Sequence, residues 1–276
     1  MKLDVLICTL DEGIIRVPEV LITPHENVTY VVSMQYTDEA MLQLIPQTLR
    51  EREDVQIVTM AGKGVSRNRN HALQAAQGDI ALIADDDVKY CHEYFDCIID
   101  TMQSNKDVDV AHFKILSTDG GVVKEYPPTE FRHPQVPRGM YVSSIEIVLR
   151  VASVRGKVWF DERFGLGSSH FICGEEDIFL CDAARAGLEI AYFPHYIVEH
   201  PSESTGSRTY TDERVMMARG AVQYYLHGST AWLRMSKFAF MSAVRGKGKF
   251  MQLLRGTFKG INHYRKIVEY ENTIGR

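Results

Sequence analysis

The chain has 276 residues, of which 45% are hydrophobic and 24% are charged. This composition is that of an ordinary globular protein, and it excludes disordered, collagen-like and disulfide-scaffold classes. The formal net charge of -5 conceals an acidic body and a basic tail. Residues 1–200 hold 31 Asp and Glu against 18 Lys and Arg, whereas residues 201–276 hold 5 against 13.

The cysteines and the apolar runs indicate the compartment. The five cysteines are scattered and form no C-x-x-C pair, which predicts free thiols in a reducing environment. No apolar run approaches the roughly 18 to 20 residues that span a bilayer. The first eight residues become polar too early for a signal peptide. We therefore expect a cytoplasmic protein that does not span a membrane.

Short apolar runs rich in Val, Ile and Tyr predict strands. In chain order these runs are Leu3–Cys8, Val28–Met34, Val55–Met60, Asp79–Ala84, Val108–Leu116, Tyr141–Leu149 and Glu189–Phe193. Apolar spacing predicts helices over Asp38–Arg50, Ser66–Gln77 and Glu93–Ser104. This alternation predicts an α/β fold, with a mostly parallel sheet flanked by helices. Ligands of such sheets bind beyond the carboxyl ends of the strands, where we expect the site.

The basic tail is predicted to be helical. The apolar spacing indicates helices over Asp212–Leu226, Ala231–Val244 and Lys249–Phe258, and no acidic residue occurs from Arg214 to Val268. Such helices either pack on the body or a second subunit, or bind an anionic membrane surface. Nucleic-acid binding is not expected, because the acidic body would repel the phosphates and no binding motif is present.

The strand predicted at 79–84 runs directly into three carboxylates, Asp85, Asp86 and Asp87. Neighbouring anions repel one another unless a cation or solvent screens them. In an extended segment Asp85 and Asp87 would point the same way and offer oxygen ligands to Mg²⁺ or Mn²⁺. The alternative is a solvated turn in which one Asp caps the next helix. These residues alone leave both interpretations open.

A basic turn precedes the helix predicted at 66–77. Ser66 is expected to be its N-cap, and three cations crowd the helix start, where the dipole disfavours positive charge: Lys63, Arg67 and Arg69. A phosphate, or a carboxylate of the Asp triplet, would balance them. The alternative is a solvated basic turn.

A third informative segment is Gly174-Glu175-Glu176-Asp177, which starts a predicted helix that ends at Gly187. Acidic residues in a first turn complement the helix dipole, which is the structural interpretation. An Asp surrounded by other carboxylates is also suited to act as a general base, because like-charged neighbours raise its pKa.

The order of these segments is more specific than any one of them. The chain resembles the family 2 glycosyltransferases with the GT-A fold over roughly residues 3–200, through Gly64–Ala72, Gly78–Val88, Phe160–Gly165, Gly174–Asp177 and Val198-Glu199-His200. The resemblance implies a GT-A catalytic domain at 1–205. Its nucleotide-sugar half would lie at about 1–105 and its acceptor half at about 106–205, followed by a basic helical extension at 206–276.

The resemblance also implies roles for single residues. The Asp triplet looks like the D-x-D motif of the family, and the implied ligands of a divalent Mn²⁺ or Mg²⁺ are Asp85, Asp87 and His200. The residues implied to bind the nucleotide sugar are Thr9, Lys63, Arg67, Arg69, Asn70, Asp85 and Asp86. Asp177 matches the catalytic base, and Glu176 would orient the acceptor hydroxyl.

The function implied by the resemblance is inverting transfer of a sugar from a nucleotide-diphosphate donor, with UDP favoured, to a hydroxyl. The acceptor would be a saccharide or a lipid-linked saccharide, in bacterial-type polysaccharide or glycolipid synthesis. The enzyme would be cytoplasmic, or peripheral on the inner face of the membrane. The alternatives are a sugar-nucleotide-binding protein of the same fold without transferase activity and a sugar-nucleotide pyrophosphorylase. The latter usually has a glycine-rich basic loop after its first strand, where this chain reads Thr9-Leu10-Asp11-Glu12-Gly13.

Overall fold

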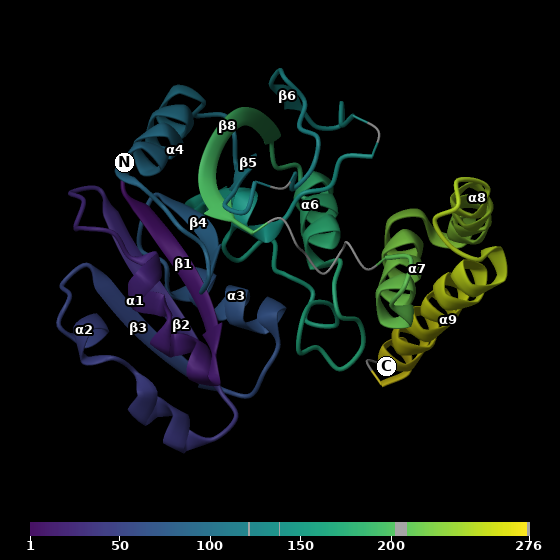
Figure 1. Cartoon of the computed structure of the whole chain (residues 1–276), viewed down its shortest axis with the longest axis horizontal. Coiled ribbons are helices and arrows are strands. Elements are labelled where there is room, and N and C mark those ends of the chain that lie inside the picture. The colour runs from purple at the N-terminus through teal and green to yellow at the C-terminus, as the bar shows by residue number, and fades with distance from the viewer. Residues whose placement is uncertain (121, 138, 202–208, 275–276) are drawn as a thin grey trace. The chain divides into compact units, whose positions relative to one another are not determined.

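The computed structural model of the chain describes residues 1–120, 122–137, 139–201 and 209–274 (Figure 1). The chain divides into two compact units. The sheet unit comprises residues 1–160 and 179–202, and the helical unit comprises residues 161–178 and 203–276. Residues 161–178 thus group with the C-terminal helices. Their position in the chain, between two segments of the sheet unit, did not predict this grouping. The domain boundaries given above stay a prediction, because compactness does not show which segments fold independently.

The sheet unit contains an eight-stranded sheet with the strand order β3-β2-β1-β4-β7-β5-β8-β6. Its strands are β1 Leu3–Leu10, β2 Val28–Tyr36, β3 Val55–Ala61, β4 Ile80–Asp85, β5 Val110–Ser117, β6 Phe131–Arg132, β7 Ile147–Arg150 and β8 Ile190–His200. The pairs β1–β2, β1–β4, β2–β3 and β5–β8 are parallel, whereas β7 and β6 pair antiparallel with their neighbours. The predicted α/β fold with a mostly parallel sheet is therefore confirmed.

Alternate residues of the central strands face two separate apolar layers. Leu3, Val5 and Ile7 of β1 face the layer that contains α1 (Val17–Val20), α2 (Gln47–Arg50) and α4 (His92–Ser104). Leu6 and Cys8 face the layer that contains α3 (Val65–Ala75), α5 (Val151–Val154) and the later turns of α6 (Glu175–Arg185). Because both faces are covered, these strands read in the sequence as continuous apolar runs.

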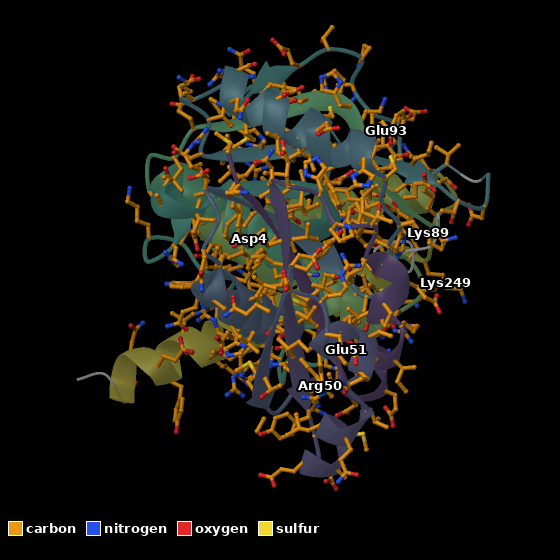
Figure 2. All side chains as sticks on the ribbon, turned by 90° about the vertical axis from the view of Figure 1, so that its left-hand side faces the viewer. Asp4, Arg50, Glu51, Lys89, Glu93 and Lys249 are labelled. Carbon is orange, nitrogen blue, oxygen red and sulfur yellow. The ribbon has the colours of Figure 1, made fainter. Side chains whose placement is uncertain are left out.

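Asp4 is a buried carboxylate at the start of β1, labelled in Figure 2. It accepts hydrogen bonds from the backbone N–H groups of Gln77 and Gly78 at 2.6 and 2.7 Å, and another from the Thr29 hydroxyl. These bonds satisfy the buried charge and attach the segment between α3 and β4 to the first strand.

Three local predictions were wrong. The predicted helix Asp38–Arg50 is a 3₁₀ turn, Glu39–Leu44, followed by the short α2, because Pro46 stands between them and cannot continue the hydrogen-bond ladder. The predicted strand at 141–149 extends only from Ile147, after a 3₁₀ turn. Ser66 is not an N-cap: Gly64, at φ 128°, holds that position, and Ser66 is the buried second residue of α3.

The helical unit contains α7 (Glu213–His227), α8 (Ala231–Val244) and α9 (Phe250–Ile274). Asp212 caps α7 by accepting a bond from the Arg214 N–H at 2.9 Å. The predicted helices are confirmed, although α9 extends well beyond residue 258, because its apolar spacing continues through Ile261, Tyr264 and Ile267. Among the described residues, no helix is both long and apolar enough to cross a bilayer.

The helices α7 and α9 approach so closely that their backbones touch. A Cβ added to Gly220 of α7 would lie 1.9 Å from the Thr257 carbonyl oxygen, and one added to Gly260 of α9 would lie 1.9 Å from that of Met217. Gly256, one turn earlier on α9, would meet the side chain of Met216. Glycines four residues apart therefore form the contact face of α9, since backbone oxygens cannot move aside as side chains can.

We expect Gly260→Ala to lower the free energy of unfolding by about 1 to 3 kcal/mol, because the new methyl group forces the two helices apart. In an open helix the same change would raise it by about 1 kcal/mol through helix propensity. Urea unfolding followed by far-ultraviolet circular dichroism measures the difference. Asn262→Ala, at an exposed position of the same helix, is the matched control. Stabilisation by Gly260→Ala would contradict the close packing.

Candidate functional site

The carboxyl ends of the parallel strands bring the predicted polar residues to one edge of the sheet. In the register of β1 and β4, Cys8 lies beside Asp85, so Thr9 and Asp86 follow as neighbours. β8 runs parallel to β5, and its last residue, His200, pairs in register with Ser117. The Asp triplet and His200 therefore lie at the carboxyl ends of their strands, the edge at which open α/β sheets bind ligands.

Asp86 is bound by the protein itself. Its carboxylate accepts a hydrogen bond from the Thr9 hydroxyl at 2.5 Å and pairs with the Arg16 guanidinium at 2.7 Å. A Cβ at Gly13 would lie 2.3 Å from the Asp86 carboxylate, so glycine is required there for the turn to close over this pair. Asp86 thus links the end of β4 to the turn after β1. Its predicted contact with the nucleotide sugar stays a prediction.

Arg69 supplies the cation that balances Asp85. Its guanidinium is buried, lies 3.3 Å from the Asp85 carboxylate and donates to the Ser144 hydroxyl at 2.7 Å. It also lies over the Phe160 ring, 5.6 Å from the centroid. A carboxylate of the Asp triplet is therefore one anion at the start of α3, as the sequence suggested.

Asn70 has a structural contact in the sheet unit. Its side-chain amide exchanges two hydrogen bonds with the backbone of Phe160, at 2.9 and 2.8 Å, which attach α3 to the end of the segment after α5. This amide is thereby held in one orientation beside Arg69. A role for Asn70 in the nucleotide pocket stays a prediction.

Lys63 and Arg67 differ from Arg69, because both side chains are exposed. No carboxylate among the described residues forms an ion pair with either of them. The Arg67 guanidinium lies beside Gly62, where an added Cβ would come within 2.9 Å of it. Two unpaired cations at the N-terminus of α3 can receive an anion from solvent, such as a phosphate group.

Asp87 and His200 come from different strands and lie together. His200 Nε2 is 3.6 Å from Asp87 Oδ1. An isolated bridge between Lys89 and Glu199 causes this proximity, since their backbones exchange two hydrogen bonds of 3.0 Å and join the segment after β4 to the end of β8. The pairing raises the pKa of His200 and lowers the pKa of Asp87, because each ion stabilises the other.

Asp87 and His200 offer ligand types that divalent ions accept. Among residues 1–120, 122–137, 139–201 and 209–274, no group of three His, Cys, Asp or Glu side chains could hold a metal on its own. Asp87 and His200 supply one hard oxygen and one imidazole nitrogen, and the Asp87 side chain is 53% exposed. Divalent ions in such sites commonly take one or two protein ligands and complete their shell with substrate phosphates and water. The residues therefore fit an ion that binds together with a diphosphate.

In the helical unit, the first turn of α6 carries Glu175, Glu176 and Asp177. Glu175 is buried, Glu176 is half-buried and Asp177 is exposed. Burial, and then the charges of these three residues and of Asp212, raise the pKa of the Cys173 thiol to about 12. The carboxylates thus gather around one point, and Asp177 is the member of the first turn that solvent reaches.

Gly174 fixes the start of α6. It has φ 100°, and an added Cβ would lie 2.4 Å from Val222 of α7. The left-handed backbone and the close approach both require glycine at this position. Packing thus explains the glycine of the Gly-Glu-Glu-Asp segment.

Sequence reasoning missed several residues that organise the edge. Arg16, which pairs with Asp86, follows a 3₁₀ turn and belongs to no motif. Asp11, at φ 49°, accepts two bonds from Thr37 at 2.7 and 2.9 Å. The Asn68 amide donates to the Thr9 carbonyl at 3.0 Å. The only sequence signal for such residues is a polar side chain close behind a strand. Of Arg16, Asp11 and Asn68, only Asp11 carries that signal.

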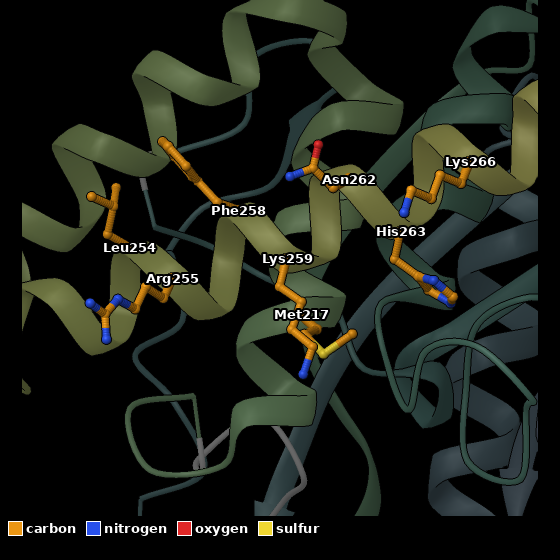
Figure 3. Close-up of a pocket in the computed structure, with 8 residues that line it drawn as sticks. All are labelled: Met217, Leu254, Arg255, Phe258, Lys259, Asn262, His263 and Lys266. Carbon is orange, nitrogen blue, oxygen red and sulfur yellow. The ribbon is translucent and has the colours of Figure 1, made fainter.

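The helical unit has a groove of about 510 Å³, shown in Figure 3. Met217 comes from α7, and the other lining residues come from α9: Leu254, Arg255, Phe258, Lys259, Asn262, His263 and Lys266. Its lining combines apolar and basic side chains, and it contains none of the site residues predicted from the sequence.

Comparison with known proteins gives a family match and a fold. Residues 24–155 match the model of glycosyl transferase family 2. No curated protein sequence matches the chain significantly. The structure is similar to S. aureus TarS 1–349, with a TM-score of 0.58 and 17% identity, covering 100% of this chain and 92% of that one.

Further TarS structures match, among them one in complex with UDP. TarS 1–349 in complex with UDP-GlcNAc has a TM-score of 0.58 and 16% identity, covering 99% of this chain and 92% of that one. A longer TarS chain has a TM-score of 0.56 and 17% identity, and the match covers 98% of this chain and 55% of that one. At these identities the likeness is one of fold.

Proposed function

We propose that the chain, a glycosyltransferase of the GT-A fold with a family 2 domain over residues 24–155, transfers a sugar from a UDP-linked donor to a hydroxyl with inversion at the anomeric carbon. The observation that carries the proposal is the meeting of Asp87 with His200 beside the Asp85–Arg69 pair, at the edge where the strands end. The family match includes the Asp triplet and Arg69, whereas Asp177 and His200 lie outside it.

The proposed donor is a UDP-sugar, because TarS binds UDP and UDP-GlcNAc on the same fold. On this proposal the diphosphate lies near the start of α3. Lys63 and Arg67 are exposed there and can pair with phosphate oxygens. Arg69 is already neutralised by Asp85, so its role is to fix that carboxylate for the donor ribose or the metal.

Asp87 and His200 would hold a divalent ion, Mn²⁺ or Mg²⁺, with Asp85 nearby as the third implied ligand. When bound, such an ion supplies positive charge to the diphosphate as it leaves. A nitrogen ligand favours Mn²⁺ somewhat over Mg²⁺, because magnesium prefers oxygen. Pairing with Asp87 favours the protonated form of His200, which cannot bind a metal ion. Ion binding would therefore release a proton from His200.

The proposed chemistry is a single displacement. The acceptor oxygen attacks the anomeric carbon on the face opposite the diphosphate, the bond from that carbon to the diphosphate oxygen breaks, and the bonding pair leaves with the diphosphate. Asp177 takes the acceptor proton, and Glu176 orients the hydroxyl. Asp177 suits this task because it is the exposed carboxylate of the first turn of α6, so an acceptor hydroxyl can reach it from solvent. The proposed acceptor is a saccharide or a lipid-linked saccharide of polysaccharide or glycolipid synthesis.

Thermal unfolding with UDP, GDP or dTDP, each with and without Mn²⁺, tests the donor site. We expect UDP with Mn²⁺ to stabilise the protein by about 2.7 kcal/mol at a ligand concentration a hundred times the dissociation constant. UDP or Mn²⁺ alone should stabilise it much less. Equal stabilisation by the three nucleotides would refute UDP specificity, and equal stabilisation by UDP with and without Mn²⁺ would refute the shared metal site.

The alternatives give different products. A pyrophosphorylase would release pyrophosphate from UTP and a sugar 1-phosphate, and a binding protein would turn over no donor. After β1 the chain forms a 3₁₀ turn, Asp11–Ile15. A pyrophosphorylase usually carries a glycine-rich phosphate loop at this place, so the turn favours a transferase over a pyrophosphorylase. Proton NMR of the product gives the anomeric configuration, and retention of the donor configuration would overturn the single displacement.

A further inference from the structure

Helix α8 has two apolar faces, and only one of them is covered. Ala231, Met235, Ala239 and Ser242 are buried against the other helices of the unit. The opposite face carries Leu233, Phe240, Met241 and Val244, which are 76, 58, 37 and 67% exposed. These four positions recur at helical spacing, so they form one stripe. Soluble monomers rarely expose a contiguous patch of this kind unless it binds something.

The turn after α8 continues the exposed apolar surface. Phe250 and Met251, at the start of α9, are 37 and 51% exposed. Val244 precedes this turn in the sequence, and Phe250 and Met251 follow it. The helical unit thus exposes six large apolar side chains within 19 residues, Leu233 to Met251.

Cations surround this apolar surface. Those between Ala231 and Phe258 are Arg234, Lys237, Arg245, Lys247, Lys249 and Arg255, and the segment contains no Asp or Glu. Arg234, Lys237, Arg245 and Lys249 are exposed. Lys247 lies over the Tyr210 ring, 5.8 Å from its centroid, so its charge is held on the same unit.

We propose that the exposed face of α8 and the turn to α9, which we call the α8 surface, bind the surface of an anionic bilayer. The apolar side chains would enter the boundary between headgroups and acyl chains, and the surrounding Lys and Arg would pair with anionic headgroups. The proposal goes beyond the transfer reaction. It gives the enzyme a position at the membrane, where a lipid-linked acceptor would be found.

Charge favours a membrane over a second copy of the chain. In a two-fold symmetric dimer the same patch meets itself, so the cations of one α8 surface would face those of the other, and residues 231–258 contain no carboxylate to balance them. An anionic bilayer matches both the charge and the apolar stripe. This occupant is therefore the one that the described residues support.

Flotation of the full chain tests the proposal, with vesicles of phosphatidylcholine and with vesicles that also contain phosphatidylglycerol. We expect binding only to the anionic vesicles at low salt, and loss of that binding at high salt, since charges on a surface are screened. Leu233→Ser/Phe240→Ser should lower the partition coefficient by roughly tenfold or more. Lys237→Gln should lower it by roughly fivefold.

The matched control is Leu166→Ser/Tyr270→Ser, which removes two apolar side chains of the same unit that are 56 and 67% exposed. It should float as the wild type does. Equal flotation of Leu233→Ser/Phe240→Ser and wild type, or no flotation at any salt, would overturn the proposal. So would a dimer that this double variant dissociates. UDP stabilisation of the vesicle-free variants should be unchanged, which separates failure of this inference from failure of the donor site.

Discussion

Asp177→Asn is expected to lower kcat for sugar transfer by about 100- to 10,000-fold, the range that a general base contributes. The amide keeps the size of the side chain and can still accept a hydrogen bond, but it cannot take the acceptor proton. Stabilisation by UDP with Mn²⁺ should stay within a factor of about 2, because binding the donor requires no base. Steady-state transfer assays and thermal unfolding measure the two effects.

Asp182→Asn is the matched control, because it removes the same charge from the same helix. Asp182 lies five residues later on α6 and pairs with Arg185 at 3.2 Å. It should leave kcat unchanged. If Asp177→Asn retains wild-type kcat, or if both variants lose activity equally, Asp177 is not the base and the proposed mechanism is wrong.

Asp87→Asn is expected to lower kcat/KM by about 100- to 1,000-fold, a loss comparable to that of one group that stabilises the leaving charge. The change removes the negative charge that pairs with His200 and would bind the ion. The dependence of activity on Mn²⁺ should move to higher concentrations, so excess Mn²⁺ should recover part of the loss. Assays over a Mn²⁺ series give this shift directly.

Asp96→Asn serves as the control for Asp87. Asp96 lies on α4 with a side chain 60% exposed, and it pairs with His25 at 3.1 Å. It should leave the Mn²⁺ dependence unchanged. A wild-type Mn²⁺ dependence in Asp87→Asn would show that Asp87 is not a ligand, even if activity falls for another reason.

The sequence by itself determined the fold class and the place of the candidate site. Continuous apolar runs between helical segments are the signature of strands buried on both faces, and the polar residues that follow them had to gather at one edge of a parallel sheet. The chain pattern likewise determined α7 and α8, whose apolar spacing and Asp212 cap act within a few residues. Local interactions decide these features, so a local pattern reveals them.

Pairings between distant segments were decided only by the tertiary structure. The bridge from Lys89 to Glu199 brings His200 to Asp87, and Arg16 reaches Asp86 across a turn that carries no motif. The two helices that touch through Gly220 and Gly260, and the uncovered face of α8, are likewise invisible in the sequence. Helical spacing shows that residues share a face, but what covers that face depends on contacts between residues far apart in the chain.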